Sequence, residues 1–148
     1  MASRADGLTV DRPRDRYGRP LPSDADPSLA FPSLTQPPTG ESTLVTGADT
    51  WAQALALLSD DLPFHAHEVF EQRWRCCPTA ERDLWRALAQ WAAALTHRAR
   101  GNPIGARRLA ERAAAGLETS ALLYAPDATP TEADLSAVRA SLADLVAE

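Results

Sequence analysis

The chain has 148 residues, a formal net charge of -5 and 45% hydrophobic residues. This length suits one domain, and the negative charge argues against binding of nucleic acid or an acidic membrane by the chain as a whole. No apolar run approaches the roughly 20 residues that span a membrane. The cysteines, Cys76 and Cys77, are adjacent and do not suit a disulfide between elements. We therefore expect a cytoplasmic protein in a reducing environment.

Residues 1–47 differ in composition from the rest of the chain. Prolines recur there among Ser, Thr, Asp and Gly, without helical or strand periodicity. We expect a disordered tail, since such a segment buries too little apolar surface to offset its chain entropy. Within it, residues 11–22 alternate Arg with Asp around Tyr17. That stretch could dock on an acidic surface or bind a polyanion, but we favour a solvated tail of mixed charge.

Residues 48–148 are expected to form one helical domain, and we predict an all-α fold. Apolar residues recur at helical spacing throughout, and no strand pattern competes. We expect a small irregular bundle of about five helices with a central αα-hairpin. Four helices are predicted at 48–58, 63–75, 79–100 and 103–117. A fifth is opened by a capping box of Thr129 and Glu132 and ends near Ala147.

Local signals support these boundaries. Pro63 suits a first helical turn, where its missing N–H costs nothing. Gly101 is a favourable residue just past a helix end, and Asn102 with Pro103 suits the start of the next helix. The helix at 79–100 has the widest apolar arc, which predicts a central position. Its members are Leu84, Trp85, Leu88, Trp91, Ala92, Leu95 and Ala99, while the opposite face holds Arg86, Gln90, Ala93 and His97.

The helix at 63–75 carries the most unusual pattern. At 100° per residue, Phe64, His67, Glu71 and Trp74 share one side, with Glu68 at its edge. Surface helices usually place charged groups opposite aromatic ones. A polar site or a buried polar network is therefore expected on this face.

Two sequence blocks together resemble a family known as domain of unknown function 309. One block is Phe-x-Ala-His67-Glu68-Val-Phe-Glu71-x-x-Trp74, and the other runs from His97 through Arg100-Gly101-Asn102-Pro-Ile-Gly105 to Leu109. The resemblance covers roughly residues 50–118. It implies a small, mainly helical domain of bacterial and archaeal stand-alone proteins, with no established activity. By that pattern the signature positions are His67, Glu68, Glu71, Trp74, Gly101, Asn102 and Gly105.

The order His67-Glu68-x-x-Glu71 differs by one residue from the zinc-hydrolase motif H-E-x-x-H. Catalytic zinc generally has three protein ligands and one open position. His67, Glu71 and either His97 or His65 would meet that number, with Glu68 as the base that activates water. Read this way, the chain is a metal-dependent hydrolase that uses a divalent metal.

We favour a structural role for His67, Glu68 and Glu71 over a metal site. His67 and Glu71, four positions apart, form an ordinary pair on a helix surface. Glu68 or Glu71 could also accept the indole N–H of Trp74, Trp85 or Trp91, giving a polar network that sets helix register.

The start of the helix at 103–117 suggests a third possibility. Helix N-termini favour anions, and Arg98, Arg100, Arg107 and Arg108 gather at this end of the hairpin. A small anionic ligand would fit there. We favour the simpler view that Arg98 and Arg100 complement the dipole of the preceding helix while Arg107 and Arg108 face water.

Taken together, these patterns predict a non-enzymatic module that binds a ligand or a protein partner. We expect a groove between the helices at 63–75, 79–100 and 103–117, and we expect no cofactor. The hydrolase is the alternative. The candidate binding residues are His67, Glu71, Trp74, Gln90, His97, Asn102 and Arg107.

Overall fold

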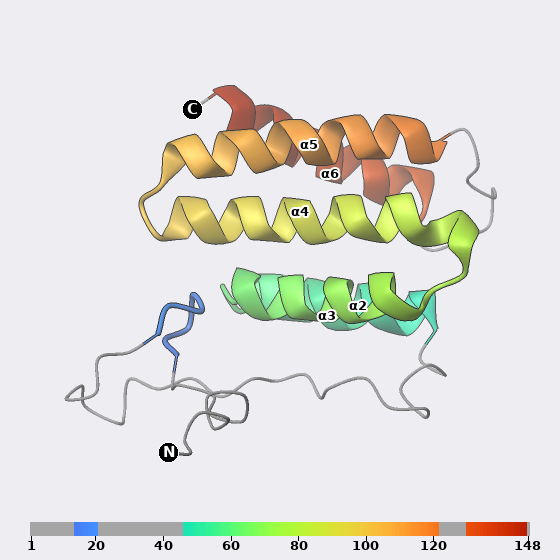
Figure 1. Ribbon diagram of the computed structural model, residues 1–148, viewed down its shortest axis with the longest axis horizontal. Helices are drawn as coiled ribbons and strands as arrows, with labels where there is room; N and C mark the ends of the chain where they lie inside the picture. The colour runs from blue at the N-terminus through green and yellow to red at the C-terminus, as the bar shows by residue number, and fades with distance from the viewer. Residues whose placement is uncertain (1–13, 21–45, 122–129, 148) are drawn as a thin grey trace, which may run out of the picture.

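The computed structural model describes residues 14–20, 46–121 and 130–147. Residues 46–121 and 130–147 form α-helices and one 3-10 turn, which confirms the all-α prediction, and residues 14–20 form a turn closed by an isolated bridge between Arg14 and Pro20. Figure 1 shows α4 in the middle, with α2 and α3 on one side and α5 and α6 on the other. No helix of the described ranges is long and apolar enough to cross a membrane. The elements are α2 (Gly47–Ser59), α3 (Pro63–Cys76), η3 (Thr79–Glu81), α4 (Arg82–Ala99), α5 (Pro103–Ala121) and α6 (Glu132–Ala147).

Helix α4 is the centre of the bundle because it is apolar around most of its circumference. Alanines supplement its large side chains on several sides, and they allow neighbouring helices to approach closely. Aromatic rings join α4 to the first two helices, since Trp91 lies 6.4 Å from Trp51 and 6.3 Å from Phe70 between ring centroids. The buried residues of α4 are Leu84, Trp85, Ala87, Leu88, Ala89, Trp91, Ala92, Ala94 and Thr96.

The turn between α4 and α5 ends one helix and starts the next, as predicted. Gly101 has a φ of +82°, a conformation that L residues adopt at a cost. Its N–H donates to the Arg98 carbonyl at 3.0 Å, and the Asn102 N–H donates to the His97 carbonyl at 2.9 Å. This pair of bonds is a Schellman motif. The Asn102 side chain then accepts the Gly105 N–H at 3.1 Å and caps α5.

The capping box of α6 lies two residues later than predicted. The Thr131 N–H donates to the Asp134 carboxylate at 2.9 Å, and the Asp134 N–H donates to the Thr131 hydroxyl at 3.1 Å. The predicted box of Thr129 and Glu132 is wrong because Glu132 is the first helical residue. A box needs its carboxylate three positions after the cap. Thr129 itself lies outside the described residues.

Helix α6 is joined to the central helix by one polar contact. The Trp91 indole N–H donates to the Ser141 hydroxyl at 3.0 Å. Around it, four apolar side chains of α6 are buried in the core: Leu135, Val138, Leu142 and Leu145.

The link between α2 and α3 is short and strained at one position. Asp61 has a φ of +59°, a region in which Asp and Asn are tolerated better than most residues. Pro63 then starts α3 in its first turn. This link places Asp60 and Asp61 beside the N-terminus of α3.

Candidate functional site

The polar face of α3 is assembled as predicted. The rings of Phe64 and His67 lie 6.1 Å apart, and the His67 Nε2 atom lies 3.6 Å from the Glu71 carboxylate. Glu71 also accepts from the Arg75 guanidinium at 3.0 Å. The His67 and Glu71 side chains are 25% and 32% exposed. This row is therefore a partly solvated network of pairs one helical turn apart.

The His67 imidazole is held in its neutral form. Burial is the main cause that lowers the pKa of His67 below its ordinary 6.5, and it outweighs the opposite effect of Glu71. The positive charges of Arg75 and Arg100 lower this pKa further. A neutral imidazole beside a carboxylate could serve as a metal ligand or as a hydrogen-bonding group.

His97, the candidate third ligand, belongs to a different cluster. Its Nδ1 atom lies 3.0 Å from the Asn102 amide nitrogen, at the turn between α4 and α5. A Cβ added to Gly105 would lie 3.0 Å from the same Nδ1 atom, so the ring covers this turn closely. Burial and the charge of Arg100 lower the pKa of His97. His97 thus packs over a helix cap.

The described residues do not fit a metal centre. Within residues 14–20, 46–121 and 130–147, no three His, Cys, Asp or Glu side chains lie close enough to share an ion. Glu68, the candidate base, is half-buried on α3. The spacing of the motif places His67 and Glu71 together, but the fold does not add a third ligand to them.

The buried indoles use acceptors other than those predicted. Trp85 donates to Glu81 at 2.9 Å, and Trp91 donates to Ser141, so the prediction of Glu68 or Glu71 is wrong for both. Arg73 also donates to Glu81, at 2.8 Å. Burial works to raise the pKa of Glu81, but these bonds from Trp85 and Arg73 outweigh it and leave the pKa lowered.

The remaining predicted binding residues are dispersed. The Trp74 ring lies under Arg82 and Arg86, at 5.5 and 6.0 Å from their guanidinium carbons. Gln90 lines a shallow hollow of about 400 Å³ between α4 and α5, and Arg107 is exposed on α5. Trp74, Gln90 and Arg107 therefore occupy three separate places, apart from the pair of His67 with Glu71 and the pair of His97 with Asn102.

The larger groove lies between α2, the link from α2 to α3, and α4. Its volume is about 770 Å³. The groove predicted from the sequence lies between α3, α4 and α5, and this groove is at a different place. The reason is that small side chains let α5 pack closely on α4, as where Gly116 approaches Ala87. The lining residues are Tyr17, Leu55, Leu58, Ser59, Asp61, Pro63, Trp91, Leu95, Arg98 and Ala99.

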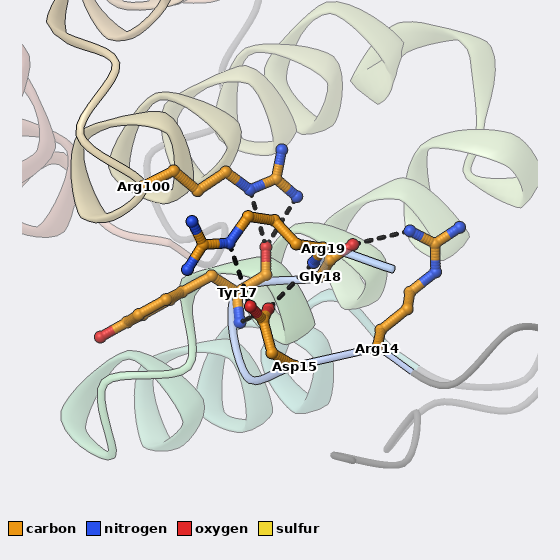
Figure 2. Close-up of polar contacts among 6 residues, drawn as sticks. All are labelled: Arg14, Asp15, Tyr17, Gly18, Arg19 and Arg100. Carbon is orange, nitrogen blue, oxygen red and sulfur yellow. Dashed lines mark hydrogen bonds and ion pairs between the residues drawn. The ribbon is translucent and has the colours of Figure 1, made fainter. Parts of the chain in front are cut away.

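One lining residue of this groove, Tyr17, belongs to residues 14–20, which we call the docked turn. It lies within the segment predicted to be disordered, and residues 1–13 and 21–45 of that segment lie outside the described residues. Figure 2 shows the Asp15 carboxylate accepting from the backbone of Tyr17 and Arg19. Arg14 donates across the turn to the Gly18 carbonyl at 2.6 Å. The turn is thus organised by its own side chains.

The docked turn reaches the bundle through four groups, which we call the turn-docking surface: Asp60, Asp61, Phe64 and Arg100. The Arg100 guanidinium donates two bonds, of 3.0 and 2.7 Å, to the Tyr17 carbonyl. Arg16 donates to the Asp60 carbonyl at 3.0 Å, and the Tyr17 hydroxyl donates to the Asp61 carboxylate at 2.7 Å. A Cβ at Gly18 would overlap the Phe64 ring.

The sequence analysis singled out this segment and favoured a solvated tail over docking. In the structure, residues 14–20 lie against the link between α2 and α3, where the Asp60 carbonyl accepts from Arg16 and the Asp61 carboxylate accepts from the Tyr17 hydroxyl. The available signal was the alternation of Arg and Asp around a Tyr-Gly pair, together with two adjacent aspartates at a helix link.

Comparison with known proteins adds a family but no activity. No match was found among curated proteins or among solved structures. A family model does match, and it covers α2 from Trp51, all of α3 and α4, and the start of α5. Both blocks that carried the resemblance, around His67 and around Asn102, lie inside this range. Residues 51–109 of the chain therefore match the model of the DUF309 family, a domain of unknown function.

Proposed function

We propose that this protein is a non-enzymatic binding module that holds an apolar ligand in the groove between α2 and α4. The single observation that carries the proposal is the groove itself. Its volume of about 770 Å³ falls in the range of pockets that bury small molecules, roughly 300–1,000 Å³.

The lining of the groove supports an apolar ligand. Leu58, Trp91 and Leu95 line it together with Leu55, which is 38% exposed. Polar groups of Ser59, Asp61 and Tyr17 join the lining at the link between α2 and α3. Apolar walls with a few polar groups are the usual composition of ligand sites, in which the polar groups set orientation.

The proposal is tested by titrating full-length protein with anilinonaphthalene sulfonate, a dye that fluoresces in apolar sites. We expect saturable binding that Leu55→Asn weakens at least tenfold. Ile104→Asn is the matched control, because Ile104 is 56% exposed on α5 and does not line the groove. Equal effects of the two substitutions, or unsaturable dye binding, would contradict the proposal.

A further inference from the structure

The docked turn has the properties of a ligand whose receptor is the helical domain. Its internal bonds, from Arg14 to Gly18 and from Tyr17 and Arg19 to Asp15, need no contribution from the bundle. The Asp15 N–H also donates to the Arg19 carbonyl at 2.9 Å. A segment that is organised before it binds loses little conformational entropy on binding.

The receptor side belongs to the family domain, and the ligand side does not. All four groups of the turn-docking surface lie within residues 51–109, whereas the turn precedes that range. The surface contacts four features of the turn. Arg100 donates to the Tyr17 carbonyl, the Asp60 backbone carbonyl accepts from Arg16, and the Asp61 carboxylate accepts from the Tyr17 hydroxyl. The Phe64 ring leaves room only for a glycine at position 18.

We propose that the turn-docking surface is a peptide-recognition site for a compact Arg-Tyr-Gly turn presented by another protein chain. Residues 14–20 are then the resident competitor that occupies the site in cis. The recognition chemistry is backbone capture by a guanidinium, a backbone carbonyl for the Arg side chain, a carboxylate for the Tyr hydroxyl, and an aromatic face against glycine.

The contacts between the docked turn and the bundle are weak enough for a peptide of another chain to displace the turn. The bonds from Arg16 to Asp60 and from Tyr17 to Asp61 are solvent-exposed, and exposed polar contacts contribute little free energy each. Gly18 is the buried residue of the turn. The turn belongs to the same chain as the surface, so it competes as an intramolecular ligand with an effective local concentration. A partner must overcome that local concentration, which makes the resident turn inhibitory.

The test uses full-length protein in which the resident turn is released by Gly18→Ala. The added Cβ overlaps the Phe64 ring, and the φ of +80° at this position disfavours alanine. Gly18 lies outside the helices, so the bundle keeps its fold. A fluorescein-labelled peptide with the sequence of residues 12–22 is titrated, and binding is read by fluorescence anisotropy.

We expect saturable binding of this peptide to the Gly18→Ala protein and at least tenfold weaker binding to the wild-type protein, whose own turn competes. Arg100→Gln added to the Gly18→Ala protein should abolish binding. A peptide that itself carries Gly18→Ala should also fail to bind, and this control leaves the protein unchanged.

Two results would overturn the proposal. One is the absence of peptide binding to the Gly18→Ala protein. The other is equal affinity for wild-type and Gly18→Ala protein, since the resident turn would then not occupy the site. Dye binding in the α2–α4 groove is measured separately, so failure of the groove proposal and failure of this one are distinguishable.

Discussion

The Arg100 guanidinium, at the end of α4, donates two hydrogen bonds to the backbone carbonyl of Tyr17, a residue 83 positions earlier. Because the acceptor is a backbone carbonyl, this contact depends on the path of the turn rather than on a particular side chain. The bidentate geometry needs a guanidinium, which lysine does not supply. Arg100 thereby fixes the middle of the docked turn.

Replacing Arg100 by Gln should release the turn and destabilise the protein modestly. Loss of bonds from a charged donor corresponds to a decrease of about 1–2 kcal/mol in the free energy of unfolding. Urea denaturation followed by circular dichroism measures this change. Arg107→Gln is the control, because Arg107 is an exposed arginine on α5 and its replacement should leave the unfolding free energy unchanged.

Replacing His67 by Gln should reduce the loss of stability in mild acid. Because burial lowers the folded-state pKa of His67 below 6.5, the unfolded chain takes up a proton first as the pH falls. Stability is therefore lost from about pH 6.5 down to the folded-state pKa, and no further loss from this group occurs below it. Melting temperatures at a series of pH values compare the two proteins.

A proton NMR titration of the His67 ring provides the independent check on that sign. A midpoint above 6.5 in the folded protein would contradict the expected pH dependence, since the ion pair with Glu71 would then dominate over burial.

Removing the cap of α5 with Asn102→Ala should lower the free energy of unfolding by about 1 kcal/mol, the usual effect of an N-cap substitution. Gly105→Ala should fail to give the stabilisation that alanine normally brings to a helix, because the new Cβ would lie 2.6 Å from the Asn102 amide nitrogen. Thermal unfolding of both variants tests this pair. A Gly105→Ala protein that is more stable than the wild-type protein would show that the Asn102 side chain moves aside without loss of stability.

The polar link between α4 and α6 is tested by Ser141→Ala. This change leaves the Trp91 indole N–H without its acceptor, and the expected decrease in unfolding free energy is roughly 1–2 kcal/mol. Ser136→Ala is the matched control, since Ser136 is exposed on the same helix. If both substitutions have the same small effect on the unfolding free energy, water replaces Ser141 as the acceptor of the Trp91 indole N–H without loss of stability.

Structural features that depend on residues close together in the chain could be predicted from the sequence. Gly101 and Asn102 mark the turn from α4 to α5 because caps and Schellman bonds join neighbours in the chain. His67 and Glu71 share a face because one helical turn separates them. These features follow from the geometry of one helix, and the structure places them as expected.

Contacts between distant residues were not predictable in the same way. Ser141 accepts from Trp91 across 50 positions, and no spacing rule selects it over Glu68 or Glu71, which are nearer in the chain. The joining of His97 to Asn102 rather than to His67 depends on how α3 packs against α4. The docking of residues 14–20 depends on three helices meeting at one end of the bundle.

The contact between Tyr17 and Arg100 also has a consequence for the order of folding. Adjacent helices such as α4 and α5 are joined by short turns, so their packing requires little loop closure and should form early. The bond that spans 83 positions closes a long loop at a higher entropic cost, onto a surface that exists only once α3 and α4 have met. Substitutions in the turn should therefore accelerate unfolding while leaving the folding rate nearly constant.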